Sequence, residues 1–383
     1  MAEKVAHLIT RLDLGGAQQN TLHTVRNLNR DYYEPVLISG RGGILDDEAT
    51  NDSSFRTVFV DSLVRDISPF QDLLAVFELA SVLLRERPTV LHTHSSKAGI
   101  LGRLAGAVAG VPIVVHTYHG FGFHDRQPAF VKSLYVFLER LCAHFTSALV
   151  FVSRSNIAYA AAHGLVRPED AVLIRSGVAL AGLPAKVDAA KLKMSAGVGM
   201  HKSLVVSVGN LKPQKNAADF VAAAAAVLKE VPESRFVFLG DGPERKKLEA
   251  RAFALGLEGK VLFLGWRRDA AQWLAAADVF VMTSLWEGLP RALVEAMKSG
   301  RPAVCYATDG VTDLIREGEN GFSVEPGDHA ALAAKVVALL KDDAARKRMG
   351  AAAAASVGPE FDIDGMVRSQ EALYSRLLSA RED

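Results

Sequence analysis

The sequence predicts an α/β protein made of two doubly wound, Rossmann-like domains that face a cleft. Short apolar runs typical of buried strands alternate with helical patterns along most of the chain. The alternation begins again near residue 203, and each half opens with a strand, a glycine-containing loop and a helix. Strands that alternate with helices are joined by crossover connections, which give a parallel sheet with helices on both faces.

The first half begins with a strand at Lys4–Thr10, a loop that contains Gly15 and Gly16, and a helix at Ala17–Leu28. Glycine in such a first turn lets the backbone approach a ligand closely, which makes Gly16 a candidate binding residue. Later runs in this half predict further strands at Glu34–Ser39, Thr57–Val60, Val90–His94, Ile113–Thr117 and Ala148–Val152.

The second half repeats this opening with a strand at Ser203–Val208 and a helix at Ala217–Glu230. Strands are then expected at Arg235–Gly240, Val261–Leu264, Val279–Thr283 and Ala303–Tyr306. We place the two domains at residues 1–185 and 186–358, followed by a C-terminal helix within 359–383. That helix is amphipathic, so it is expected to pack on another part of the chain, with the first domain as the candidate.

The bulk composition excludes several classes of protein. The chain has 383 residues, which suits two ordinary domains, and its 49% hydrophobic and 23% charged residues are typical of a globular protein. A net charge of +1 gives no electrostatic reason to expect a nucleic-acid partner. Cys142 and Cys305 form neither a disulfide framework nor a metal-type spacing, so a cytoplasmic location is expected. No apolar run reaches the roughly 18 residues of a membrane span, and peripheral contact with the inner membrane face stays open.

The segment Trp286–Met297 carries the strongest chemical signal. It follows a predicted strand, and Pro290 suits the first turn of a helix because its missing N–H costs nothing there. The amides of this helix start carry partial positive charge, which favours a phosphate. Glu287 and Glu295 bracket the helix start with seven residues between them. Either acid alone would be an ordinary surface residue, but the two together predict a ligand with sugar hydroxyls beside its phosphates.

The loop Gly209–Asn216 joins a strand to a helix in the same way. Lys215 lies at the mouth of that helix and can neutralise a diphosphate, although a solvated loop lysine is an equal alternative. The loop lacks the Walker A pattern, which disfavours P-loop ATP chemistry. The chain also lacks the G-x-G-x-x-G fingerprint, which disfavours nicotinamide and flavin enzymes.

Histidines crowd the first half of the chain at positions 92, 94, 116, 119 and 124. Their spacing matches no standard zinc motif, so no metal site is predicted. We interpret His92 and His116 as interior residues whose ring nitrogens are satisfied. His119 is followed by Gly120 directly after a strand, and it is the candidate for a group in the cleft.

With these motifs the chain resembles the family 4 retaining glycosyltransferases, which have the GT-B fold. The resemblance extends over essentially the whole length, and the Glu-x7-Glu pattern of Glu287 and Glu295 is its most diagnostic part. Further matching segments are Gly15-Gly16, His119-Gly120, Val208 to Lys215, Leu239 to Glu244, Phe263 to Trp266 and Asn320 to Phe322. The segments His92–Arg103 and His116–His124 look like the branch that builds bacterial cell-surface polysaccharides.

The resemblance implies that Glu287, His119 and Lys215 are the catalytic residues. Glu287 would hold the hydroxyls of the donor sugar, and Glu295 would hold those of the ribose. Lys215 would neutralise the diphosphate, and His119 would reach in from the acceptor domain. The leaving diphosphate carries extra negative charge, which Lys215 and the helix amides would stabilise without a metal.

A second set of residues is expected to line the donor: Gly16, Gly209, Asn210, Trp266, Arg267, Gly288, Leu289 and Pro290. By the resemblance, the three residues after Glu287 present their backbone to the sugar and phosphates, and the Trp266 region borders the base. Two positions depart from the family pattern. Asn210 stands where an arginine is usual, so Lys212 or Arg291 would have to supply the second phosphate cation. Gln18 stands where a glutamate is usual, which puts a family contact at that position in doubt.

The function implied is that of a metal-independent, retaining, hexosyltransferase-type enzyme that needs no cofactor. It would move a sugar from a nucleotide-diphosphate donor, with a UDP-sugar favoured, to a glycan or polyprenol-linked acceptor. No carboxylate nucleophile is evident, so the acceptor is expected to attack on the face from which the diphosphate departs. One alternative is an isomerase of the UDP-N-acetylglucosamine 2-epimerase type, which shares the architecture but lacks the Glu-x7-Glu pattern. A second is a non-catalytic nucleotide-sugar-binding protein, which the intact Glu287, Lys215 and His119 disfavour.

Overall fold

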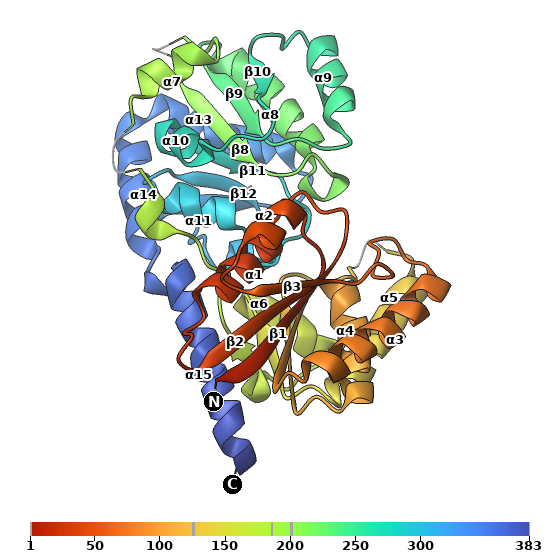
Figure 1. Cartoon of the computed structure of the whole chain (residues 1–383). Coiled ribbons are helices and arrows are strands. Elements are labelled where there is room, and N and C mark those ends of the chain that lie inside the picture. Colours follow the sequence, from red (N-terminus) through yellow and green to blue (C-terminus); the bar gives the residue numbers. More distant parts are fainter. Residues whose placement is uncertain (1, 125–126, 185–186, 200–201, 383) are drawn as a thin grey trace. The chain divides into compact units, whose positions relative to one another are not determined.

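The computed structural model describes residues 2–124, 127–184, 187–199 and 202–382. The chain forms two compact units, and each has its own sheet. The first unit comprises Met1–Gly177 with Asp362–Asp383, and the second comprises Val178–Phe361. The boundary expected between residues 185 and 186 lies outside the described residues. In Figure 1 the first unit runs from red to yellow, with its C-terminal segment in dark blue.

The first unit contains a seven-stranded parallel sheet with the order β3-β2-β1-β4-β5-β6-β7. The strand order reverses between β1 and β4, and α/β sheets bind ligands outside the carboxyl ends of strands at such a reversal. The strands are β1 Glu3–Arg11, β2 Tyr33–Gly40, β3 Arg56–Phe59, β4 Val90–His94, β5 Ile113–Tyr118, β6 Ala148–Phe151 and β7 Val172–Leu173.

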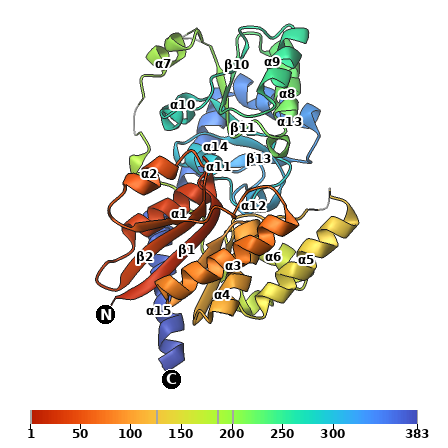
Figure 2. The same ribbon diagram turned by 45° about the vertical axis from the view of Figure 1, so that its right-hand side comes forward.

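Helices cover both faces of this first sheet. The helices of the unit are α1 Gly16–Asn27, α2 Asp46–Asn51, α3 Pro69–Glu86, α4 Ser96–Ala109, α5 Ala129–Ala143, α6 Arg154–Ala162, the 3-10 turn η1 Pro168–Asp170, and α15 Ile363–Glu382. Apolar residues of α3 and α4 pack on one face, and Figure 2 shows these two orange helices next to each other. Helix α5 packs on the same face further along the sheet, around Tyr118 and Phe151.

The C-terminal helix α15 covers the opposite face of the first sheet. Met366, Val367 and Tyr374 of α15 form one buried cluster with Val5 of β1 and Val90 of β4. Figure 1 shows this dark-blue helix alongside the red strands β1 and β2. The last segment of the chain is therefore part of the core of the first unit, because the apolar stripe of the helix is buried against that sheet.

The second unit contains a six-stranded parallel sheet with the order β10-β9-β8-β11-β12-β13. Its strands are β8 Leu204–Val208, β9 Arg235–Leu239, β10 Val261–Phe263, β11 Val279–Met282, β12 Ala303–Tyr306 and β13 Gly321–Val324. The order reverses between β8 and β11, so the second sheet is doubly wound like the first. Each predicted strand of both units is present, with ends within one residue of the prediction, whereas β7 and β13 were not predicted.

Helices also cover both faces of the second sheet. They are α7 Ala189–Ser195, α8 Ala217–Glu230, α9 Arg245–Ala254, α10 Ala270–Ala276, α11 Arg291–Lys298, α12 Asp309–Thr312, α13 His329–Lys341 and α14 Asp343–Ser356, with 3-10 turns η2 Leu180–Gly182, η3 Pro213–Lys215 and η4 Pro359–Phe361. The core of one face centres on Phe220 of α8, which packs edge-on against Phe236 and Phe238. Among the described residues, no helix is both long enough and apolar enough to cross a membrane.

Candidate functional site

Two loops of the second unit meet at the point where its strand order reverses. One loop follows β8 and the other follows β11, and these two strands are paired. The backbone N–H of Leu285 donates to the Gln214 carbonyl, and the Gln214 side-chain amide donates back to the Trp286 carbonyl, both over 2.8 Å. The Thr283 hydroxyl donates to the carbonyls of Lys215 and Asn216 at 3.0 Å. The two segments that the sequence singled out are thus held side by side at the expected ligand-binding edge.

Lys215 and Glu287 form an ion pair across these two loops, with Lys215 Nζ donating to Glu287 Oε1. Only 9% of the Glu287 side chain and 20% of the Lys215 side chain are exposed, so water screens the pair weakly. The N–H of Glu287 donates to Asp309 Oδ2 over 3.1 Å. Asp309 is the first residue of α12, so this hydrogen bond ties the backbone of Glu287 to the start of that helix. Two residues 72 positions apart therefore form one charged pair at the edge of the sheet.

Glycines allow the loops of this site to approach each other closely. A Cβ atom at Gly310 would lie 2.1 Å from the Gly288 carbonyl oxygen, so any other residue there would push the loop after Glu287 away. A Cβ atom at Gly209 would lie 3.1 Å from Cε of Lys215. The lysine side chain thus lies over the bare backbone of Gly209, which directs it toward Glu287.

Helix α11 begins directly after the Glu287 loop. Pro290 is the residue before its first turn, rather than within it, and the Pro290 carbonyl accepts from the N–H groups of Leu293 and Val294. Leu289 and Pro290 are buried, and the helix ends where Gly300 takes a positive φ of 73°. Because burial desolvates the charged form, the pKa of Glu295 is raised, and Arg291 one turn earlier opposes that shift.

The start of α8 differs in detail from the sequence expectation. Asn216 is the N-cap residue, but its φ is +44° and its side chain makes no capping hydrogen bond. Its amide instead donates to Asp219 Oδ2, which also accepts from the Tyr306 hydroxyl. Lys215 closes the 3-10 turn before the helix, and Asn210 is half-buried in the same loop.

Trp266 and Arg267 follow β10 in the second unit. The Trp266 side chain is 47% exposed, which leaves an indole face open at the surface. Arg267 binds Asp269 through two parallel bonds of 2.7 Å, and this partner lowers the pKa of the Asp269 carboxyl. The guanidinium is therefore oriented by its own loop.

Gly16 and His119 belong to the first unit. Gly16 is the first residue of α1, with Gly15 in extended conformation as its N-cap. His119 directly follows β5 and is half-buried, and its Nε2 lies 3.1 Å from Nδ1 of His94. Gly120 has a φ of +145°, which favours glycine at this position. Both residues therefore lie at the carboxyl edge of the first sheet, after β1 and β5 respectively.

A cluster of three buried histidines lies beside His119. One ligating nitrogen from each of His7, His92 and His94 falls within 4.8 Å of the others. Burial lowers the pKa of all three imidazoles, that of His7 to about 3. The interpretation of His92 as an interior residue agrees with its contacts, because its two nitrogens bond to Tyr374 and Thr117. For His116 the prediction was half wrong: the residue is buried and its Nδ1 bonds to the Thr93 hydroxyl, but its Nε2 has no hydrogen-bond partner among the described residues. His7 and Tyr374 were missed, because only the pairing of β1 with β4 and the docking of α15 bring them here.

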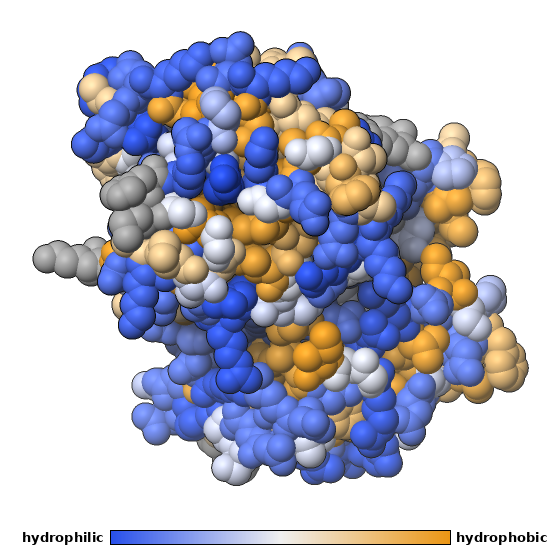
Figure 3. Space-filling view, turned by 90° about the horizontal axis from the view of Figure 1, so that it is seen from above, coloured by the Kyte–Doolittle hydropathy of each residue, from blue (hydrophilic) through white to orange (hydrophobic). Residues whose placement is uncertain are grey.

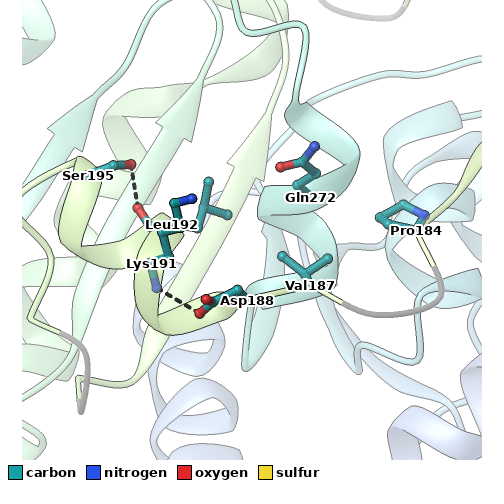
Figure 4. A pocket seen from close by; sticks show the side chains of 7 residues that line it. All are labelled: Pro184, Val187, Asp188, Lys191, Leu192, Ser195 and Gln272. Atoms are coloured by element: carbon teal, nitrogen blue, oxygen red, sulfur yellow. Dashed lines mark hydrogen bonds between the residues drawn. The ribbon is translucent and has the colours of Figure 1, made fainter.

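A separate pocket lies between α7 and α10 of the second unit, and Figure 4 shows the side chains that line it, among them Pro184, Leu192 and Gln272. The Asp188 carboxylate at its edge accepts the N–H of Lys191 and so caps α7. The Ser195 hydroxyl donates to the Leu192 carbonyl of the same helix. These polar groups serve the local helix, and the pocket contains no predicted site residue.

The sequence reasoning also missed the residues that assemble the Lys215–Glu287 pair. Gln214, Thr283 and Asp309 fix the two loops by the bonds described above. Gln214 lies within the predicted loop Gly209–Asn216 and Thr283 ends a predicted strand, so their positions were a usable signal. Asp309 lies 22 residues beyond Glu287, and nothing local in the sequence connects the two.

Comparison with known proteins identifies the family. The family described as "Glycosyl transferases group 1" matches residues 190–356, and the "Glycosyl transferase 4-like domain" matches residues 15–177. A UDP-Gal:alpha-D-GlcNAc-diphosphoundecaprenol alpha-1,3-galactosyltransferase of Escherichia coli is 35% identical over 85% of this chain and 84% of its own. An N-acetyl-alpha-D-glucosaminyl L-malate synthase of Bacillus anthracis is 28% identical over 84% of each chain.

Solved structures share the fold over nearly the whole chain. HepE of Anabaena, solved with UDP-glucose, superimposes with a TM-score of 0.83 at 24% identity and covers 97% of this chain and 99% of its own. Sucrose-phosphate synthase of Thermosynechococcus elongatus gives a TM-score of 0.85 at 20% identity over 99% of this chain and all of its own. The predicted fold class is confirmed, and the chain belongs to the group 1 glycosyltransferases, retaining enzymes of the GT-B fold.

Proposed function

We propose that the second unit binds a UDP-sugar between the loops after β8 and β11 and releases UDP as the sugar is transferred. The Lys215–Glu287 pair carries this proposal, because it puts a cation and a sugar-binding acid together at the strand reversal. Lys215 faces the diphosphate, and Glu287 accepts hydrogen bonds from the sugar hydroxyls. Glu295 holds the ribose, and the exposed face of Trp266 borders the base. The E. coli relative, named for a UDP-galactose donor, supports uridine over other bases.

The chemical problem in this reaction is the negative charge that develops on the leaving diphosphate. Lys215 and the N-terminal amides of α11 stabilise that charge, and Arg291 or Lys212 supplies the cation that an arginine at position 210 would otherwise provide. The family generally works without a metal, and in this scheme the cations and amides do that work. The acceptor attacks on the face from which UDP departs, and a diphosphate oxygen takes its proton. His119 orients the reacting groups, and Gly16 lets the backbone approach the ligand.

The acceptor we propose is a sugar on a polyprenyl diphosphate at a membrane surface. The E. coli relative is named for such an acceptor, GlcNAc-diphosphoundecaprenol. An enzyme that acts on a membrane-embedded lipid benefits from a surface that binds the bilayer. The face of α3 and α5 that points away from the first sheet has the character of such a surface.

Large apolar side chains are exposed along both helices. On α3 they are Phe70, Leu73, Phe77 and Leu84, on α5 they are Phe130, Leu134 and Phe137, and each is between 56% and 75% exposed. They recur at helical spacing, so each helix presents one apolar stripe outward. Figure 3 shows apolar side chains at the right-hand edge, the side on which Figure 1 draws α3 and α5. An exposed apolar face of this size marks a binding surface in a folded protein.

The charges on these helices fit an anionic lipid surface. The four acidic side chains within α3 and α5 are engaged at the protein side of the helices: Asp72 with Lys97, Glu78 with Ser62, Glu86 with Lys4 and Arg56, and Glu139 with Arg103. The exposed charged residues of the two helices are cationic, namely Arg85 and Arg140. Anionic headgroups are thus met by apolar and basic side chains without repulsion.

The reaction is tested by incubating the enzyme with UDP-galactose and other UDP-sugars and a short-chain GlcNAc-diphosphate lipid. We expect a disaccharide whose new linkage keeps the anomeric configuration of the donor, as read by NMR. An inverted linkage would exclude same-face attack. An epimerised donor without acceptor would point to the isomerase, and donor binding without turnover would leave a binding protein.

Membrane docking is tested by co-sedimentation with vesicles that contain phosphatidylglycerol, compared with pure phosphatidylcholine. A variant with Phe70, Phe77, Phe130 and Phe137 changed to serine is expected to bind the anionic vesicles about tenfold more weakly or worse, because four aromatic insertions are lost. Its turnover of a water-soluble acceptor should not change. The matched control is Phe253→Ser on α9, which removes an equally exposed phenylalanine of the second unit. Unchanged vesicle binding by the four-serine variant would refute the proposal that this face binds membranes. A wild-type dimer that becomes a monomer in the four-serine variant would also refute it, because the face would then be a protein interface.

A further inference from the structure

A continuous chain of hydrogen-bonding groups runs from His119 into the interior of the first unit. His119 Nε2 lies 3.1 Å from His94 Nδ1, and His94 Nε2 lies 3.1 Å from His7 Nδ1. His7 Nε2 lies 3.5 Å from the Tyr374 hydroxyl, which is the longest link in this series. That hydroxyl also bonds to His92 Nδ1, and His92 Nε2 lies 2.7 Å from the Thr117 hydroxyl. The chain thus joins residues of β1, β4 and β5 to the C-terminal helix α15.

The members behind His119 are enclosed in the protein. His7, His92 and Tyr374 are fully buried, and His94 and Thr117 are exposed by no more than 3%. Burial lowers the pKa values of the three histidines and raises that of Tyr374, so all four side chains are neutral near pH 7. The links of the chain are made by imidazole nitrogens and hydroxyls. The charged neighbour Glu371 accepts the N–H of Asn29 instead.

Because these side chains are neutral, the directions of the hydrogen bonds that link them depend on one another. A neutral imidazole donates from one nitrogen and accepts at the other, so a ring that donates outward must accept from within. The Tyr374 hydroxyl could accept from both His7 and His92, but its own buried O–H would then have no acceptor among these groups. When that O–H also donates, two arrangements satisfy every link, one in which each group donates toward Thr117 and one in which each donates toward His119. These two arrangements differ in the donor and acceptor of every hydrogen bond. If one residue favours one arrangement, all the other residues must adopt it as well. The tautomer of His119 is coupled in this way to a tyrosine of α15.

We propose that His94, His7 and Tyr374 are positioning residues that hold His119 in one tautomer for sugar transfer. This inference rests on the proposed role of His119 in the reaction. Helix α15 then has a second role besides covering the core. Its Tyr374 hydroxyl connects the hydrogen bonds of His119, His94 and His7 to those of His92 and Thr117. The nitrogen that His119 presents to a ligand, as donor or acceptor, is then set about three side chains away from the ligand itself.

A metal ion held by His7, His92 and His94 is the competing explanation of the cluster. The rings of His7 and His94 are nearly parallel, with 5.3 Å between centroids and 8° between planes, and their facing nitrogens are 3.1 Å apart. The two rings therefore point their nitrogens at each other, whereas ligands of a tetrahedral ion point at a third, shared centre. The nitrogens of all three histidines are also used within the chain itself. The geometry therefore favours the hydrogen-bonded chain.

The test compares Tyr374→Phe with Tyr33→Phe. Both changes remove one phenol hydroxyl at the interface of α15 with the first sheet, but the Tyr33 hydroxyl bonds to Glu371 and Ser375, outside the chain. Tyr374→Phe is expected to lower kcat about fivefold, as the loss of one buried hydrogen bond would. KM and UDP affinity should not change, because the donor binds the second unit. In 15N NMR of the imidazoles, His119 should pass from one tautomer to a mixture, and Tyr33→Phe should behave as wild type.

A double-mutant cycle with His119→Ala separates positioning from a structural effect. If Tyr374 acts through His119, Tyr374→Phe has no further effect on kcat in the His119→Ala background. Effects that multiply, or a His119 tautomer unchanged by Tyr374→Phe, would overturn the proposal. If the protein holds one equivalent of tightly bound zinc that is lost in His7→Ala, the cluster is a metal site and the hydrogen-bond proposal is wrong. If His119→Ala alone is fully active, the proposed role of His119 fails, while the NMR comparison still decides whether the chain sets its tautomer.

Discussion

Lys215→Ala is expected to lower kcat/KM for the UDP-sugar by two to three orders of magnitude, the range found when one donor to a developing oxyanion is removed. Two effects act in the same direction. The diphosphate loses the cation that neutralises its growing charge. The carboxylate of Glu287, only 9% exposed, loses its partner and then faces a diphosphate with uncompensated negative charge.

The measurement is steady-state kinetics with a soluble acceptor, together with calorimetric titration of UDP. Lys341→Ala is the matched control, because it breaks an exposed lysine–glutamate pair with Glu230 in the same unit. That variant should keep wild-type kinetics. Lys215→Arg should retain part of the activity, since it preserves the charge with a different geometry. Wild-type kcat/KM in Lys215→Ala would remove the basis of the proposed donor site.

Glu139→Gln is expected to lower the free energy of unfolding by about 3–5 kcal/mol, the cost of breaking a buried ion pair from one side. Arg103 of α4 is fully buried and Glu139 of α5 is 2% exposed, and they pair over 2.5 Å. Glu139 also accepts from the Tyr118 hydroxyl at 2.6 Å, and burial together with this carboxylate raises the pKa of Tyr118. With glutamine at position 139, the guanidinium would stay buried without a counter-charge.

Urea unfolding followed by circular dichroism measures this loss. The double change Arg103→Met with Glu139→Gln should recover much of it, because no charge stays buried and the amide oxygen can still accept from Tyr118. Glu230→Gln, which removes an exposed surface carboxylate, should leave the stability close to that of the wild type. Equal stability losses for the buried and the surface variants would contradict the assignment of Arg103 and Glu139 as a core ion pair.

Most of the secondary structure could be predicted from local patterns in the sequence. The runs at Val90–His94 and Ala217–Glu230 form β4 and α8 with the predicted ends. Their apolar periodicity and flanking glycines act within a few residues, so they are visible without any tertiary contact. β7 has only two residues, too few for a pattern, and β13 begins within an Asn-Gly pair that is typical of a turn.

The sequence by itself determined the two-sheet α/β class, and it predicted the loops after β8 and β11 as the donor site. Only the tertiary structure decided which side chains meet there. The pairing of β11 with β8 brings Lys215 to Glu287, and the docking of α15 brings Tyr374 to the histidines of β1 and β4. Such contacts depend on strand order and helix packing, which are set by the burial of apolar surface over the whole chain and leave no local sequence signal.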